Sequence, residues 1–181
     1  MANRRAALLG LCAVLGSCGF RPLLGSADAP GVRAELAAVE VARLTGRVGY
    51  LVRDNLLDQL NPGGIEVPER YRLDVQLRQR TGALGIQLDN TITRYNLVLV
   101  ARFSLSDPVT RRILYRALVR RIASYNAIRA PFAELAAQRD AERRAAREVS
   151  TDIRTQLALH FVRQAEAEAE AGTAPTEAAP S

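Results

Sequence analysis

The chain has 181 residues with 25 basic and 19 acidic side chains, a net charge of +6, two cysteines and one histidine. This length fits one compact domain with additional segments, and an apolar content of 48% is enough to form a hydrophobic core. So few cysteines and histidines argue against a structural zinc or iron–sulfur site, and we expect no metal and no cofactor.

The first 17 residues have the three parts of a secretory signal peptide. Arg4 and Arg5 precede an apolar or small stretch from Ala6 to Gly16, which is too short to span a bilayer as a helix. The run Leu15-Gly16-Ser17-Cys18 resembles the bacterial lipobox, in which the cysteine sulfur receives a diacylglycerol, the preceding peptide is removed and the new amino terminus is acylated. We therefore expect a multiply acylated Cys18 that anchors the mature protein stably to a membrane. The alternative is an ordinary secretory signal with a cysteine near its cleavage site by chance.

Removal of residues 1–17 also removes Cys12, which leaves Cys18 as the sole thiol and excludes an intramolecular disulfide. Gly19 follows Cys18. An Asp at this position is the usual signal for retention of a lipoprotein in the inner membrane of many Gram-negative bacteria. Its replacement by Gly favours delivery to the outer membrane, on the periplasmic side.

The mature body is basic, and all of its cations are arginines. Residues 18–162 contain 22 Arg and 15 acidic residues, a net charge of +7. The planar guanidinium group binds phosphate or carboxylate in a bidentate manner, so this charge favours an anionic partner. Such a partner could be nucleic acid, a lipid headgroup or an acidic protein, and export from the cytoplasm disfavours nucleic acid.

Residues 18–34 contain several Gly and Pro and are expected to be a tether that follows the lipidated amino terminus. The alternation of apolar and polar residues from Glu35 to Leu44 predicts a strand that is buried on one face. A helix is predicted from about Arg47 to Leu60, with an apolar stripe of Val48, Val52, Leu56 and Leu60 that Leu51 and Leu57 widen. The sequence Asn61-Pro62-Gly63-Gly64 ends this helix.

Three further strands follow. The alternation is clearest from Tyr71 to Arg78, and it recurs from Tyr95 to Leu105 and from about Arg112 to Ser124. The connection from Gly82 to Asn90 either extends the first hairpin or presents the apolar Leu84, Ile86 and Leu88 to a partner.

A final helix is predicted from Pro131 to about Arg163, because Ala145, Val149, Ile153, Leu157 and Phe161 recur every four residues. Residues 164–181, rich in Ala and Glu, are expected to be disordered. Residues 35–163 then form one domain of the α+β class in the order β-α-β-β-β-α. Since both helices are amphipathic, we expect a two-layer sandwich, with a four-stranded mixed sheet and two helices on one face.

Two stretches together carry a resemblance to a known family. Cys18-Gly19-Phe20-Arg21-Pro22-Leu23 resembles the mature start of the LPS-assembly lipoprotein LptE family, and the run from Asp140 to Leu157 resembles its final helix in the alphaproteobacterial style. The resemblance implies a non-enzymatic outer-membrane lipoprotein. Such proteins plug the lumen of the β-barrel LptD, help the barrel to assemble and assist the transport of lipopolysaccharide to the outer leaflet.

One face of the predicted sheet is rich in arginine. The alternation places five of them opposite the apolar side of the sheet, where only Glu40 and Asp74 offer clear negative charge: Arg72, Arg78, Arg102, Arg116 and Arg120. Our hypothesis is that this face meets lipid A phosphates or acidic groups in the barrel lumen. The alternative is a solvated polar face.

Catalysis is not expected. The sole histidine, His160, is next to the core residue Phe161, and the sequence has no Gly-x-Ser-x-Gly motif, phosphate-binding loop or His/Cys cluster. Two other kinds of anchored protein remain open. One is an auxiliary lipoprotein of a lipid-trafficking ABC transporter, and the other is an envelope scaffold that binds peptidoglycan.

Overall fold

The computed structural model describes residues 30–86, 92–126 and 130–173. These residues form seven elements: α3 (Pro30–Ala37), β1 (Val39–Val41), α4 (Gly46–Leu60), β2 (Tyr71–Ile86), β3 (Ile92–Ser106), β4 (Ile113–Asn126) and α5 (Pro131–Thr173). The α+β class and the four-stranded mixed sheet are confirmed, and a helix precedes the predicted order of elements. The predicted signal peptide, the lipidation site at Cys18 and most of the predicted tether lie outside the described residues.

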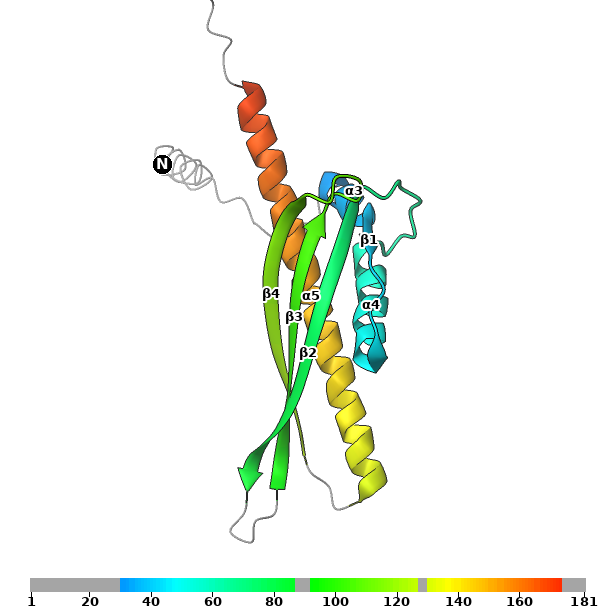
Figure 1. Cartoon of the computed structure of the whole chain (residues 1–181), viewed down its shortest axis with the longest axis vertical. Helices are drawn as coiled ribbons and strands as arrows, with labels where there is room; N and C mark the ends of the chain where they lie inside the picture. The colour runs from blue at the N-terminus through cyan, green and yellow to red at the C-terminus, as the bar shows by residue number, and fades with distance from the viewer. Residues whose placement is uncertain (1–29, 87–91, 127–129, 174–181) are drawn as a thin grey trace, which may run out of the picture.

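The strands lie side by side in the order β1-β2-β3-β4 (Figure 1). β1 pairs with β2 in parallel, because α4 carries the chain back to the start of the sheet between them. β2, β3 and β4 are long antiparallel neighbours joined by short connections. The pairing with β1 ends at Leu73, so most of β2 forms an edge of the sheet.

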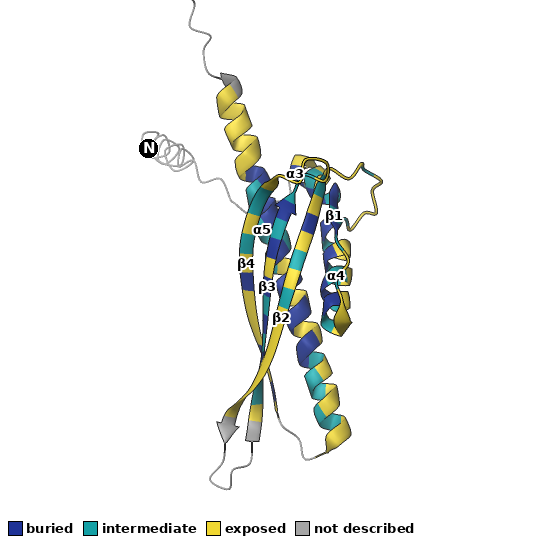
Figure 2. Ribbon diagram, viewed as in Figure 1, coloured by how far each residue is buried: buried dark blue, intermediate teal, exposed yellow. Residues whose placement is uncertain are grey.

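The helices cover one face of this sheet, and α5 runs diagonally across it with α4 at its side (Figure 1). The predicted stripe of α5 is confirmed as the centre of the core, since Ala145, Val149, Ile153 and Leu157 are fully buried. They pack with the side chains of β3 that alternation predicted to be buried, from Leu97 to Leu105. Figure 2 shows that the buried positions lie where the helices and the sheet meet.

α4 begins at Gly46, whose φ of 78° suits glycine, and ends before Asn61. Val52, Leu56 and Leu60 are buried as predicted, but Leu57 is 40% exposed. The expectation that Leu57 widens the buried stripe was wrong, because its side chain lies in a hollow beside β1. With only three residues, β1 is too short to cover it.

A buried carboxylate joins three elements. Glu142 of α5 is 5% exposed and accepts hydrogen bonds from Gln79 of β2 (3.3 Å) and Gln138 of α5 (3.2 Å). Its second oxygen forms an ion pair with Arg47 of α4. Because a buried charge without partners is costly, this cluster favours the one arrangement of α4, β2 and α5 that satisfies it.

The predicted first strand was too long. The structure has only Val39–Val41 as a strand, preceded by the helix Pro30–Ala37, so the predicted tether ends before residue 30 rather than at residue 34. Val32 and Leu36 are buried one helical turn apart, and Pro30 occupies a first-turn position that tolerates proline. The sequence prediction missed this helix because it relied on the alternation from Glu35 to Leu44 and did not use the helical spacing of Val32 and Leu36.

The last helix is longer than predicted. Residues 164–173 continue α5 to Thr173, and residues 164–171 are exposed, so the expected disorder of this part of the tail was wrong. Ala and Glu have high helix propensity and extend a helix that is already nucleated by its packed part. Residues 174–181 lie outside the described residues. β2 likewise runs to Ile86, which shows that the connection after Gly82 extends the hairpin.

Candidate functional site

The five arginines predicted to share a face all lie on the face of the sheet away from the helices. Arg72, Arg78, Arg102, Arg116 and Arg120 are exposed. Contacts on the covered face fix this orientation: Gln79 reaches Glu142 of α5, and Arg121 forms two 2.5 Å hydrogen bonds with Asp152 of α5. Since neighbouring side chains of a strand point to opposite faces, the residues on either side of Gln79 and Arg121 point outward. We call this surface the open face.

The register places the arginines of different strands close together. Arg78 and Arg120 flank Val100 on its two sides, because Val100 is the partner of both. Arg116 lies opposite Ser104, and Arg102 lies opposite Gln76. Directly opposed residues have Cβ atoms about 5 Å apart, so these guanidinium groups can reach a common ligand.

Sequence reasoning missed two arginines of the open face, and one of them, Arg94 of β3, donates a hydrogen bond to Asn126 of β4. Arg80 is exposed and lies opposite Val98, in the row next to Arg78. The strand prediction ended at Arg78, although the alternation continues through Gln79 and Arg80. Extension of the alternation by two residues would have found it.

Arg72 differs from the other arginines because acidic groups surround it. Its Nη1 lies 3.2 Å from Glu40 Oε2, and its Nε lies 3.6 Å from Asp74 Oδ2. These are the two acidic residues that the sequence placed on this face, and both are engaged by Arg72. Within the described ranges, five other arginines of the open face form no ion pair: Arg78, Arg80, Arg102, Arg116 and Arg120.

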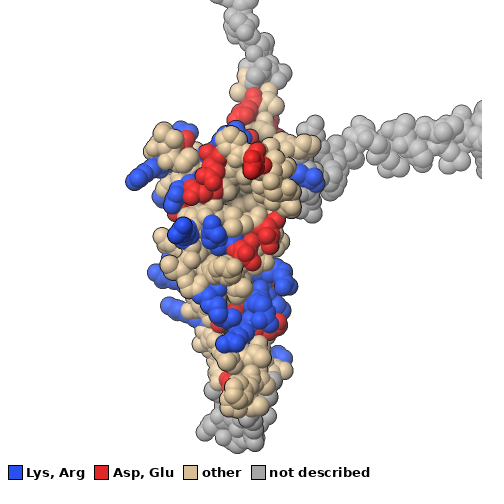
Figure 3. All heavy atoms as spheres, turned by 90° about the vertical axis from the view of Figure 1, so that its right-hand side faces the viewer, with Lys and Arg blue, Asp and Glu red and all other residues tan. Residues whose placement is uncertain are grey.

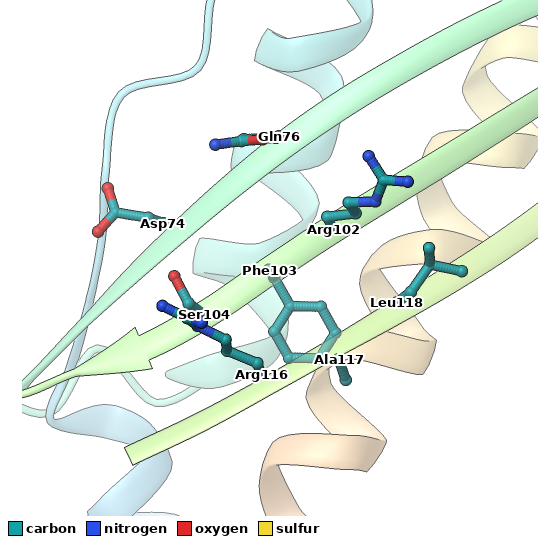
Figure 4. Close-up of a pocket in the computed structure, with 8 residues that line it drawn as sticks. All are labelled: Asp74, Gln76, Arg102, Phe103, Ser104, Arg116, Ala117 and Leu118. Atoms are coloured by element: carbon teal, nitrogen blue, oxygen red, sulfur yellow. The ribbon is translucent and has the colours of Figure 1, made fainter. Parts of the chain in front are cut away.

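A shallow hollow of about 470 Å³ lies on the open face, toward the end of the sheet where β2 and β4 begin (Figure 4). Its polar lining comes from three strands: Asp74 and Gln76 on β2, Arg102 and Ser104 on β3, and Arg116 on β4. Arg102 and Arg116 supply positive charge, while Gln76 and Ser104 can donate hydrogen bonds. Such a set of donors suits a phosphate or carboxylate group.

The side of the molecule that carries β1 and α4 has a different charge pattern. On the face with β1 and α4, Figure 3 shows acidic side chains mainly in the upper part and arginines mainly in the middle. Several of these arginines are neutralised, among them Arg70 by Glu35 and Arg47 by Glu142. Arg47 and Arg70 thus differ from the arginines of β2, β3 and β4 that form no ion pair on the open face in the described ranges.

His160 lies at the covered side of the sheet. Its ring stacks on Tyr115 of β4, with centroids 4.9 Å apart and planes at 19°. Burial, and then the positive charge of Arg163, lower the pKa of His160 below its usual range. Among the described residues, no group of three His, Cys, Asp or Glu side chains is placed to hold a metal ion.

Comparison with known proteins identifies the family. A family model described as "LptE: Lipopolysaccharide-assembly" matches residues 35–157, about two thirds of the chain. The chain belongs to the LptE family. This confirms the resemblance on which the sequence interpretation rested.

Individual relatives share the sequence or the fold. An uncharacterized protein of Rickettsia prowazekii is 25% identical over 158 residues, which cover 87% of this chain and 97% of that protein. A crystallised protein of Caulobacter crescentus, described as a candidate lipoprotein, is 29% identical with a TM-score of 0.63, over 74% of this chain and 97% of its own. A minor lipoprotein of Acinetobacter baumannii, 18% identical, has the same fold with a TM-score of 0.53 over 66% of this chain and 87% of its own. In the part of the chain that the structure describes, no helix combines the length and apolarity needed to cross a bilayer.

Proposed function

We propose that this LptE-family chain is a lipoprotein of the outer membrane, held on the periplasmic side through Cys18. There it plugs the LptD barrel, helps the barrel to assemble and assists the transport of lipopolysaccharide to the outer leaflet. The match of the LptE model to residues 35–157 carries this proposal. The relative from Caulobacter crescentus, described as a candidate lipoprotein, supports the anchored state.

The open face supports direct contact with lipopolysaccharide. Lipid A carries phosphate groups, and five arginines of this face have no carboxylate partner in the described ranges. The guanidinium group meets phosphate through two parallel hydrogen bonds, a geometry that Lys would not supply. We propose that Arg78, Arg116 and Arg120 bind these phosphates, with Arg102 and Arg80 beside them. Arg72 contributes less, because Glu40 and Asp74 already neutralise it.

The proposed role is binding rather than catalysis. The open face combines cations with aliphatic side chains, and the arginines at its centre come from three different strands. This arrangement can hold an anionic molecule through charge-assisted hydrogen bonds.

Purification of the chain from membranes tests the partner. Recovery together with an outer-membrane β-barrel identified as LptD is the expected result. Recovery with an inner-membrane transporter complex, or retention on peptidoglycan sacculi, would refute the proposed partner. Mass spectrometry of the same sample checks that Cys18 is the acylated amino terminus.

Charge reversal tests the contact with lipopolysaccharide. The triple variant Arg78→Glu, Arg116→Glu and Arg120→Glu is expected to bind lipopolysaccharide at least about tenfold more weakly, because several charge-assisted hydrogen bonds are lost. A control variant carries the same charge change on exposed helix positions away from the open face: Arg33→Glu, Arg139→Glu and Arg147→Glu. Equal affinity of the two variants would refute the assignment of the phosphate site.

A further inference from the structure

The open face carries aliphatic as well as charged side chains. Val98 and Val100 of β3 are half-buried there, and Leu118 and Ile122 of β4 are 50% and 47% exposed. An antiparallel sheet with one face on the core usually presents polar residues to solvent on the other face. These four side chains, which we call the aliphatic strip, depart from that pattern.

The register makes the strip continuous across two strands. Val98 lies directly opposite Ile122. Val100 lies diagonally between Leu118 and Ile122, since its direct partner on β4 is Arg120. Leu118 and Ile122 are four positions apart on β4, so the strip is about 13 Å long.

Arginines lie beside the strip and within it. Arg78 and Arg80 of β2 lie opposite Val100 and Val98, respectively. Arg120 lies within the strip, between Leu118 and Ile122 along β4, and Arg102 of β3 lies at one end of the strip, opposite Leu118. None of these four arginines has an acidic partner in the described ranges. The open face thus combines an apolar strip with unpaired positive charge beside and within it, and we call these four arginines the arginine frame.

We propose that the aliphatic strip holds an acyl chain of the lipid A part of lipopolysaccharide, while the arginine frame binds its phosphate groups. This inference rests on the proposed function and adds the residues that recognise the hydrocarbon. One molecule then supplies both kinds of chemistry that the face offers. A second copy of the chain fits poorly, because pairing of two open faces would place the arginine frames against each other.

Comparison of intact with fully deacylated lipopolysaccharide, both dispersed in detergent, separates the two contributions. The full chain is expected to bind the intact form at least about tenfold more tightly. The double variant Leu118→Gln and Ile122→Gln should lose most of this preference and still bind the deacylated form as the wild type does. Both positions are about half exposed, and covering the exposed part of two such side chains accounts for a factor of this size.

A matched control uses aliphatic residues that are exposed elsewhere. The double variant Leu57→Gln and Ile65→Gln changes side chains that are 40% and 60% exposed beside β1, and it should keep the full preference. Circular dichroism checks that both variants retain the fold. A strip variant that still prefers intact lipopolysaccharide would overturn the inference. In that case, weaker binding of lipopolysaccharide by the Arg78→Gln, Arg120→Gln variant would still support the phosphate site.

Two other outcomes also decide the question. Equal binding of phosphatidylglycerol with the same dependence on Leu118 and Ile122 would show a site for any anionic lipid and would overturn the assignment to lipid A. Failure of the wild type to bind either form of lipopolysaccharide would remove both this inference and the proposed direct contact. Crosslinking of Leu118 to the barrel wall in cells, with no lipid contact, would assign the strip to the barrel instead.

Discussion

Shortening Ile153 to Ala tests how α5 holds the sheet. Ile153 is fully buried at the centre of the helix. Loss of three carbon atoms at about 0.8 kcal/mol each removes about 2.4 kcal/mol of transfer free energy. The remaining cavity adds to this cost, and we expect the free energy of unfolding to fall by about 4 kcal/mol, within the range of about 2–5 kcal/mol measured for such changes. For a chain of this size the melting temperature should fall by about 12 °C.

Urea unfolding followed by circular dichroism measures the change, with Leu135→Ala as the control. Leu135 lies on the same helix but is 42% exposed, so its truncation should cost less than about 1 kcal/mol. The intermediate variant Ile153→Val should cost about 1 kcal/mol. If Ile153→Ala and Leu135→Ala were equally stable, α5 would not cover the sheet as described.

Three further predictions concern polar groups. Burial raises the pKa of Tyr71 to about 12, so the folded state favours the neutral phenol and should lose stability between about pH 10 and pH 12. Urea unfolding across this range should show a smaller loss of stability for Tyr71→Phe than for the wild type. Burial lowers the pKa of His160, so the free energy of unfolding should decrease as the pH falls below about 6.5. The urea midpoint of His160→Phe should depend less on pH below this value. The pair of Arg121 and Asp152 joins β4 to α5, and because both side chains contact solvent, a double-mutant cycle should give a coupling below about 1 kcal/mol.

The periodic parts of the fold could be predicted from the sequence. The apolar residues of α5 recur every four positions and those of β3 every two, and both patterns match the buried residues. A short helix such as α3 has too few turns to produce a strong pattern. Of its two buried residues, Val32 was assigned to the tether and Leu36 to the first strand. The order of the strands could not be read at all, since it depends on contacts between distant segments.

The candidate site was predicted in part, for a related reason. Alternation correctly assigned Arg72, Arg78, Arg102, Arg116 and Arg120 to one face, because it requires only the period of a strand. Whether each arginine is free depends on its neighbours across the sheet. Glu40 lies opposite Arg72 in the parallel pairing with β1, a relation between positions 32 residues apart that no local pattern contains.

The length of β1 thus determines which arginines of β2 have an acidic partner. Because β1 pairs with β2 only as far as Leu73, it brings an acidic residue to Arg72 and to no arginine further along β2. Arg78 and Arg80 therefore remain unpaired on an edge strand, and Arg116 and Arg120 do so on β4, the opposite edge. Charged side chains on edge strands also oppose pairing with a strand of another molecule. A longer β1 would cover the β2 edge, so its brevity leaves Arg78 and Arg80 without an acidic neighbour on that edge.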